Sequence, residues 1–477
     1  MKHNAMLNTQ TRICYGIGGG VYAIKEAAYN TFILLFYVQV LGLSGLVTGA
    51  VIAISLLWDA VSDPLVGSWS DRLRSRYGRR HPFMVYSTLP VAIGFIGLFA
   101  PPSAVTESST LLACWLLFWS LWVRTFITTF SIPHLALSAE LTSEYNERSE
   151  LLGLRLGFLF LIVLILPALA LVLVFGADQE MDGRFIAENY PMYGLMSAGL
   201  AIVLGVITVV GTRRHTSRPD AGGENYALPS LKNYIGDVSQ TFGNKIFRTI
   251  VCFEIAASIA WGSVATLYVM VGTYVFEFSA IKMAITMAVP GVLAVALAWL
   301  LLKSISRRWQ KPQILRYSLW GMVFDTLWLL PLKLADMLPP NDSLAVLCLY
   351  LLQVTIFSFF FLLRVTSSTS IVADITDQHE LEEGGRKEGG FFSVLNFTAK
   401  MASLVGPLYG GIALDVIGLN RQDLPGEVAQ PVLAGLMYSV MLIGVPALLI
   451  ALRYAYKLQF SKEQLDDIQA TLRDRFE

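Results

Sequence analysis

The feature that most constrains this chain is a succession of apolar stretches, each long enough to cross a lipid bilayer. A bilayer core of about 30 Å requires roughly 20 apolar residues in a helix. About twelve stretches meet this requirement, and they cover residues 13–43, 45–68, 83–100, 109–138, 151–176, 192–210, 247–276, 280–302, 314–333, 344–372, 391–417 and 432–456. Because backbone groups in lipid must be satisfied within the segment, and the stretches are too long for barrel strands, the sequence predicts an all-α membrane protein with twelve transmembrane helices.

The composition excludes other classes of protein. Only 15% of the 477 residues are charged and 55% are hydrophobic, which lies outside the usual range for a soluble globular chain. The 35 basic and 35 acidic residues cancel, so no net field would attract the chain to nucleic acid. We therefore expect a lipid bilayer around the protein and no nucleic-acid partner.

The positions of Lys and Arg between the stretches predict the orientation in the membrane, because cytoplasmic loops carry an excess of these residues. Clusters follow the second, sixth and eighth stretches, and they comprise Arg72, Arg74, Arg76, Arg79, Arg80, Arg213, Arg214, Arg218, Lys232, Lys245, Arg248, Arg307, Arg308 and Lys311. Alternate loops hold only scattered cations. We expect a multi-pass plasma (inner) membrane protein with both termini in the cytoplasm.

A polar segment divides the chain into two halves. We expect an N-terminal six-helix bundle at 1–212, a central cytoplasmic loop at 213–246, a C-terminal six-helix bundle at 247–456 and a cytoplasmic tail at 457–477. The central segment contains proline and glycine, which are typical of linkers.

Two short matches indicate that the halves are repeats. Ala139–Thr142 corresponds to Ala373–Thr376, and Arg79–Pro82 corresponds to Trp309–Pro312, at nearly the same offset. Six spans repeated in the same orientation are typical of transporters whose substrate site lies between the halves. The competing interpretation is that any two cytoplasmic loops are similarly basic and polar.

Two aspartates, Asp59 and Asp63, lie inside the second apolar stretch. An ionisable group there costs at least a few kcal/mol, so it calls for a partner, a wet cavity or a function. Side chains four residues apart share one helix face, and two carboxylates so placed repel unless a proton or cation lies between them. The pair therefore predicts an ion site, and hard cations such as sodium prefer such clustered oxygens. The alternative is that Asp63, which precedes Pro64, only fixes a helix end.

Other ionisable residues lie within several of the predicted helices, and they are Lys25, Glu26, Arg124, Arg155, Glu254, Arg364 and Lys400. Because they come from so many helices, they cannot all form local salt bridges, and we expect a shared polar cavity. For any single residue, a tether between helices is an equally good interpretation. Asp325 stands apart from the rest, and we interpret it as a polar tether.

A specific motif runs through the second stretch and the loop after it: Trp58-Asp59-Ala60-Val61-Ser62-Asp63-Pro64-Leu65-Val66-Gly67, then Asp71-Arg72 and Gly78-Arg79-Arg80-His81-Pro82. Further matches are Tyr15-Gly16-Ile17-Gly18, Phe36-Tyr37, Leu41-Gly42-Leu43-Ser44, Ile132-Pro133, Glu147-Arg148, Ala373-Asp374-Ile375, Arg386-Lys387-Glu388-Gly389 and Lys400. The chain thereby resembles the glycoside-pentoside-hexuronide:cation symporter family, the group of melibiose permease, within the major facilitator superfamily. The resemblance implies cation-coupled secondary transport of a sugar or glycoside.

The resemblance also implies a cation site made of Asp59, Asp63 and Thr128. Ser131 stands where melibiose permease has a further aspartate. Two carboxylates neutralise a sodium ion less well than three, although the hydroxyls of Thr128 and Ser131 remain able to coordinate it. A proton needs only one carboxylate, so the coupling ion is expected to be H⁺ or Na⁺, with the proton favoured, and no other cofactor is expected.

The residues expected to bind the substrate are Glu26, Arg124, Arg155, Arg364, Asn396 and Lys400. Arg155 and Lys400 match the family's cationic contacts. Ala23 and Leu135 stand where melibiose permease has a sugar-binding aspartate and tryptophan, so melibiose itself is not expected. The surplus of cations favours a substrate with a carboxylate, such as a uronic acid or its glycoside.

The gating residues are expected to be Asp71, Arg72, Arg148, Asp374 and Arg386. Asp71 can accept hydrogen bonds from basic groups, and such a cluster would clamp one bundle against the other in one transport state. The alternative is that the arginines only anchor the cytoplasmic side.

Two other classes of function remain as alternatives. An intramembrane enzyme with an aspartate-rich magnesium site would need a second D-x-x-x-D cluster within the apolar stretches, and none lies there, so we expect no enzymatic activity. A carrier of lysolipids or other amphiphiles from the same superfamily, or an uncoupled facilitator, is compatible with the motifs. We expect the protein to act as a monomer on a small-molecule substrate.

Overall fold

The computed structural model describes residues 7–73, 75, 77–142, 144–176, 182–213, 245–383, 388–419 and 423–458. Within these ranges the regular elements are all helices. The predicted central loop and the predicted C-terminal tail lie almost wholly outside the described residues. The all-α fold class predicted from the apolar stretches is confirmed.

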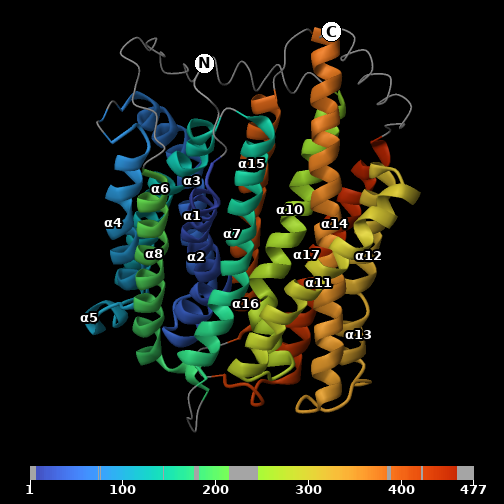
Figure 1. Cartoon of the computed structure of the whole chain (residues 1–477). Helices are drawn as coiled ribbons and strands as arrows, with labels where there is room; N and C mark the ends of the chain where they lie inside the picture. The colour runs from blue at the N-terminus through green and yellow to red at the C-terminus, as the bar shows by residue number, and fades with distance from the viewer. Residues whose placement is uncertain are drawn as a thin grey trace, which may run out of the picture. The chain divides into compact units, whose positions relative to one another are not determined.

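The chain divides into two compact units (Figure 1). The first unit comprises Met1–Leu228, Ser279–Ala284 and Leu414–Asp423, and the second comprises Pro229–Phe278, Ile285–Ala413 and Leu424–Glu477.

The first unit contains the helices that carry the predicted cation site. Its elements are α1 (Thr9–Ile17), α2 (Gly19–Ala27), η1 (Ala28–Ile33), η2 (Leu35–Val40), α3 (Gly45–Arg72), α4 (His81–Phe99), α5 (Ser103–Thr106), α6 (Ser109–Leu141), α7 (Tyr145–Leu173), η3 (Gly183–Phe185), η4 (Ala187–Asn189) and α8 (Tyr190–Thr212). Helix α6 packs against α3 and α4, and α7 packs against α1 and α2. This packing brings side chains of α2, α3 and α6 into one buried region.

The second unit is formed by the later helices. Its elements are α10 (Lys245–Met270), η6 (Val271–Val275), most of α11 (Ala280–Arg308), α12 (Lys311–Thr326), α13 (Leu329–Leu334), α14 (Leu344–Glu383), α15 (Glu388–Ser403), most of α16 (Val405–Ile417) and α17 (Gln430–Lys457). Helix α10 packs against α15 and α17, and α12 packs against α14 and α17. Phe247, Leu315 and Leu448 lie fully buried in the apolar core between these helices.

Four of the twelve predicted spans are not single continuous α-helices. The span at 247–276 ends in the π-helical segment η6, the span at 391–417 is divided into α15 and α16, and two more are interrupted. Ten helices in the described part of the chain are long and apolar enough to cross a membrane. The predicted span at 13–43 is instead divided into α1, α2 and the π-helical segments η1 and η2, and the span at 314–333 is divided into α12 and α13. The break between α1 and α2 falls at Gly18, within three consecutive glycines that weaken a helix interior. Apolar length alone does not reveal such interruptions.

The junction of α1 and α2 is packed tightly against its neighbours. A Cβ atom at Gly19 would collide with the carbonyl oxygen of Arg155, and one at Gly18 would lie 2.5 Å from Nε2 of His134. That ring nitrogen lies 2.9 Å from the carbonyl oxygen of Tyr15, to which it donates a hydrogen bond. Only residues without a side chain fit here, and the resulting contacts fix the start of α2 against α6 and α7.

Candidate functional site

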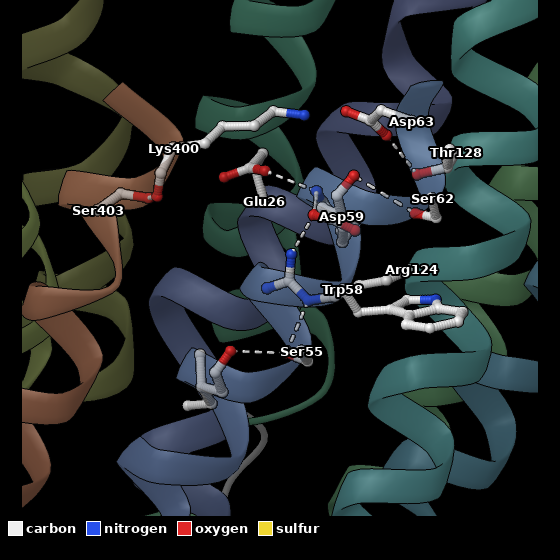
Figure 2. A network of polar contacts seen from close by, with 12 residues as sticks. Glu26, Ser55, Trp58, Asp59, Ser62, Asp63, Arg124, Thr128, Lys400 and Ser403 are labelled. Carbon is white, nitrogen blue, oxygen red and sulfur yellow. Dashed lines mark hydrogen bonds and ion pairs between the residues drawn. The ribbon is translucent and has the colours of Figure 1, made fainter. Parts of the chain in front are cut away.

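Helix α3 carries both aspartates of the motif. The helix begins after Ser44, whose hydroxyl accepts a hydrogen bond from the backbone N–H of Val47 at 3.4 Å. Asp59 is buried, with 4% of its surface exposed, and Asp63 is partly buried. They lie one turn apart along the helix, as their spacing predicts (Figure 2).

The carboxylate of Asp59 is bound by two cations of the same unit. Nη1 of Arg124, on α6, donates a hydrogen bond to Oδ2 of Asp59. Nζ of Lys25, on α2, lies 3.4 Å from the same oxygen. Asp59 is therefore the centre of a buried ion-pair network that joins three helices (Figure 2).

The side chain of Arg124 is fixed by further contacts. Its Nε donates to Oγ of Ser55 at 2.8 Å, and the Ser55 hydroxyl donates onward to the carbonyl oxygen of Ile52 at 2.7 Å. The guanidinium carbon lies 4.7 Å from the centre of the Tyr29 ring, which is a cation–π contact. Only 2% of the residue is exposed. These contacts hold the guanidinium against Asp59.

Lys25 and Glu26 are adjacent in α2 but differ in exposure. The side chain of Lys25 is 3% exposed and that of Glu26 is 34% exposed, with 3.1 Å between Nζ and Oε1. The ammonium also lies 4.1 Å from the centre of the Tyr22 ring. Glu26 therefore joins the Asp59 network through Lys25.

Asp63 is bonded to a hydroxyl of the neighbouring helix. Oγ1 of Thr128, on α6, donates to Oδ1 of Asp63 at 2.9 Å. Thr128 and Ser131 are both buried and lie three residues apart, on one face of α6. Nε1 of Trp58 donates to Oγ1 of Thr125 at 2.8 Å and ties the same two helices together. The structure thus brings Thr128 to Asp63.

Oδ2 of Asp59 already has two nitrogen cations beside it. The two nitrogen cations on Oδ2 of Asp59 would repel a third positive charge placed there. Within the described ranges, no group of three or more His, Cys, Asp or Glu side chains is placed to hold a metal ion.

The second unit contains a partly buried ion pair of its own. Nη1 of Arg364, on α14, donates to Oε2 of Glu254, on α10, at 3.0 Å. The Ser368 hydroxyl donates to the other carboxylate oxygen of Glu254. The guanidinium carbon of Arg364 lies 5.3 Å from the centre of the Phe361 ring. Arg364, which was expected at the substrate, is thus placed in a tether between α10 and α14.

The other residues expected at the substrate are distributed over both units. Arg155 lies partly buried on α7 in the first unit, and Lys400 lies partly buried on α15 in the second. The Lys400 carbonyl accepts a hydrogen bond from Oγ of Ser403 at 2.7 Å. Asn396 belongs to α15, and its side chain lies outside the described residues.

Arg80 organises a charged cluster at the end of α3. Its Nη2 donates to Oδ1 of Asp71, its Nη1 lies 2.6 Å from Oγ of Ser70, and its Nε lies 3.1 Å from Oε1 of Glu140. Nη2 of Arg79 lies 3.2 Å from the same Glu140 oxygen. The predicted gating residue Asp71 therefore contacts a base of its own unit, and that base, Arg80, was absent from the predicted gating set.

The second unit holds a similar pair, formed by residues of the matched segments. Nζ of Lys311 lies 2.8 Å and 2.7 Å from the two carboxylate oxygens of Asp374. Arg80 and Glu140 belong to one copy of the matched segments, and Lys311 and Asp374 belong to the other. In both units a base at the start of one helix meets an acid of another helix; the two acids occupy matching positions of the predicted repeat, and the two bases lie one position apart.

The remaining gating candidates and Asp325 have different surroundings. Arg72 and Arg148 are exposed, and Arg386 lies outside the described residues. Asp325, on α12, is 3% exposed and accepts a hydrogen bond from Nε1 of Trp328 at 3.2 Å. This contact is local to the break between α12 and α13.

Comparison with other sequences gives matches along nearly the whole chain. The family described as MFS/sugar transport protein matches residues 14–459. The glycoside/cation symporter YagG of Escherichia coli is 25% identical over 93% of this chain and 90% of its own length. The uncharacterized symporter YnaJ of Bacillus subtilis is 23% identical over 92% of this chain and 89% of its own. The sodium-dependent lysophosphatidylcholine symporter 1 of Mus musculus is 31% identical, but over 32% of this chain and 29% of its own.

Solved structures agree on the fold. The nucleoside transporter NupG matches with a TM-score of 0.60 at 12% identity, covering 95% of this chain and 100% of that one. A bacterial homologue of the human lysosomal transporter Spinster, in its inward-facing and occupied conformation, matches with a TM-score of 0.62 at 12% identity, covering 94% and 95%. The chain therefore has the major facilitator fold and belongs to the MFS/sugar transport protein family, as its resemblance to the glycoside-pentoside-hexuronide:cation symporters indicated.

Proposed function

We propose that this protein is a cation-coupled symporter that carries a sugar or glycoside across the plasma (inner) membrane by alternating access. It acts as a monomer with both termini in the cytoplasm. One observation carries the proposal: Asp59 and Asp63 lie one turn apart on a helix that can span a membrane, and Thr128 is bonded to Asp63. Acids at such positions mark ion pathways in membrane proteins. The relatives over the whole chain, which are named as symporters, support it.

Coupling in this proposal depends on Asp63 and Thr128. These two residues receive the charge of the coupling ion, H⁺ or Na⁺, beside the network at Asp59. Ion and substrate stabilise the same occluded conformation, so each tightens the binding of the other by the same factor. The two halves then rock to open the site to the other side. No bond in the substrate is made or broken.

The substrate that we propose is acidic, such as a uronic acid or its glycoside. Arg155 and Lys400 are the cations that we assign to its carboxylate, because they match the family's cationic substrate contacts. Glu26, which is 34% exposed, and Asn396 are assigned to its hydroxyl groups. Arg364 and Arg124 each contact a carboxylate of their own unit. They add positive charge, but we assign neither of them to a particular group of the substrate.

Uptake into proteoliposomes tests the function. Purified protein is reconstituted, and a radiolabelled glucuronide is compared with a neutral galactoside under an inward proton gradient, an inward sodium gradient and no gradient. We expect the glucuronide to accumulate above its external concentration under one of the gradients, and Asp63→Asn to abolish accumulation. Equilibration without accumulation would identify an uncoupled facilitator, and preference for the galactoside would reject the acidic substrate.

A lysolipid carrier is the second candidate function. It is favoured by the partial similarity to the sodium-dependent lysophosphatidylcholine symporter. It is also favoured by Leu135, which is 40% exposed and replaces an aromatic sugar platform with an aliphatic side chain. Transport of a labelled lysophospholipid in the same vesicles, with no uptake of either sugar, would replace the sugar proposal.

A further inference from the structure

We propose that the guanidinium of Arg124 occupies the position of a metal cation at Asp59, so that this site does not bind sodium. This proposal concerns the ion site of the proposed function, and its meaning for transport rests on that function. It assigns to Arg124 the role of a resident cation instead of the substrate contact expected from its sequence position. It also assigns Asp59 to the permanent structure of the site.

The geometry around Arg124 is that of a fixed ion. Asp59 is 4% exposed and Arg124 is 2% exposed, so little water is available to compete for either group. Arg124 touches Asp59 through Nη1, Ser55 through Nε and the Tyr29 ring through its planar face. A guanidinium held on three sides in this way has little freedom to leave the carboxylate.

Lys25 reinforces the same arrangement from α2. Its ammonium lies 3.4 Å from Oδ2 of Asp59 and 3.1 Å from Oε1 of Glu26. Lys25 and Arg124 therefore supply two positive charges against the two negative charges of Asp59 and Glu26. This group of four is balanced without a metal ion, and an added sodium ion would leave it with a positive excess.

The chemistry of sodium points the same way. A hard cation of this kind takes a shell of oxygen ligands. At Asp59 the neighbouring groups on the carboxylate oxygen are nitrogen cations, which are hydrogen-bond donors and cannot act as ligands. A metal ion could bind Oδ2 of Asp59 only if Arg124 moved away, and that would leave a buried guanidinium without its carboxylate.

Sodium binding by the purified protein tests this proposal without any knowledge of the substrate. Binding of ²²Na⁺ is measured in an Asp63→Asn parent, so that sodium held by Asp63 and Thr128 does not contribute. The parent is compared with the same protein carrying Arg124→Gly, Arg124→Lys or Arg124→Gly/Asp59→Asn. We expect no specific binding to the parent and at least about tenfold more bound sodium after Arg124→Gly, because removal of the guanidinium exposes the carboxylate of Asp59. Arg124→Lys keeps the positive charge and should not bind, and the double variant should lose the binding again.

Free guanidinium provides a second measurement on the same variant. If the arginine stands in for a cation, millimolar guanidinium should displace ²²Na⁺ from Arg124→Gly. Sodium binding by the Asp63→Asn parent, or no gain in a folded Arg124→Gly, overturns the proposal. If Arg124→Gly does not fold, sodium binding by the Asp63→Asn parent, measured alone, still decides it. Failure of every substrate to be transported would reject the proposed function and leave the sodium result intact, so the two failures are distinguishable.

Discussion

The two units bury charge in different ways. In the second unit, Arg364 and Glu254 form a single pair supported by the hydroxyl of Ser368. In the first unit, one oxygen of Asp59 serves both Arg124 and Lys25. A one-to-one pair can lose either member with a local effect, whereas the loss of Asp59 leaves two buried cations at once. We therefore expect the first unit to depend more on a single carboxylate than the second unit does.

The largest effect on stability is expected for Asp59→Asn. Removing the charge should lower the free energy of unfolding by about 3–5 kcal/mol, because Arg124 and Lys25 lose their common acceptor. The double variant Asp59→Asn/Arg124→Met should recover most of this loss. Chemical unfolding in detergent measures both. Equal stability of the single variant and the wild type would show that the first unit does not depend on this carboxylate.

A smaller loss is expected for Glu254→Gln in the second unit. The side chain of Glu254 is 14% exposed, and Gln keeps an acceptor for Ser368 and Arg364, so the loss should be about 2 kcal/mol. The same unfolding assay applies, with Glu254→Gln/Arg364→Met as the matched control. A loss as large as that of Asp59→Asn would remove the contrast between the units.

The repeated pairs outside the buried networks sharpen the comparison. Arg80 has a side chain that is 9% exposed and contacts Asp71, Ser70 and Glu140, whereas the Lys311 side chain is 40% exposed and contacts Asp374. We expect Arg80→Ala to cost about 2 kcal/mol and Lys311→Ala about 0.5 kcal/mol, the latter reduced by solvent screening. Raising the salt concentration should reduce the loss of stability caused by Lys311→Ala, because salt screens the exposed pair of Lys311 and Asp374. A larger cost at Lys311 would contradict this ranking.

A small change in stability is also expected for Asp63→Asn. Asp63 is partly buried, and asparagine can still accept the hydrogen bond from Thr128, so the change should stay below about 1 kcal/mol. Accumulation of substrate should nevertheless be lost. Unfolding and uptake are measured on the same preparation. Strong destabilisation would place Asp63 with Asp59 as a structural group.

The sequence predicted the helices because apolar length is a local property. It did not predict the break at Gly18 or the division of the span at 314–333, because the mean apolarity of a stretch is the same whether or not its helix is interrupted. The spacing of Asp59 and Asp63 correctly predicted one shared helix face. The approach of Thr128 to Asp63 was available from the family resemblance alone.

The partner of Asp59 could not be predicted from spacing. Arg124 is 65 residues away on another helix, and its contact depends on how α3 and α6 rotate against one another. Lys25 and Glu26 are neighbours in sequence, yet their exposures differ because they leave α2 in different directions. For the pairs formed by Arg80 and Lys311 the sequence did contain an indication, since both bases lie in the matched segments.

The contact between Arg124 and Asp59 also bears on how an empty carrier resets. Positive charges that belong to the polypeptide stay behind when cargo departs, so Asp59 is not left bare in the unloaded protein. Reorientation without cargo then carries no extra electrostatic barrier from this carboxylate. On the proposed function, the carboxylate that an empty carrier must carry back without its ion is then Asp63 and not Asp59.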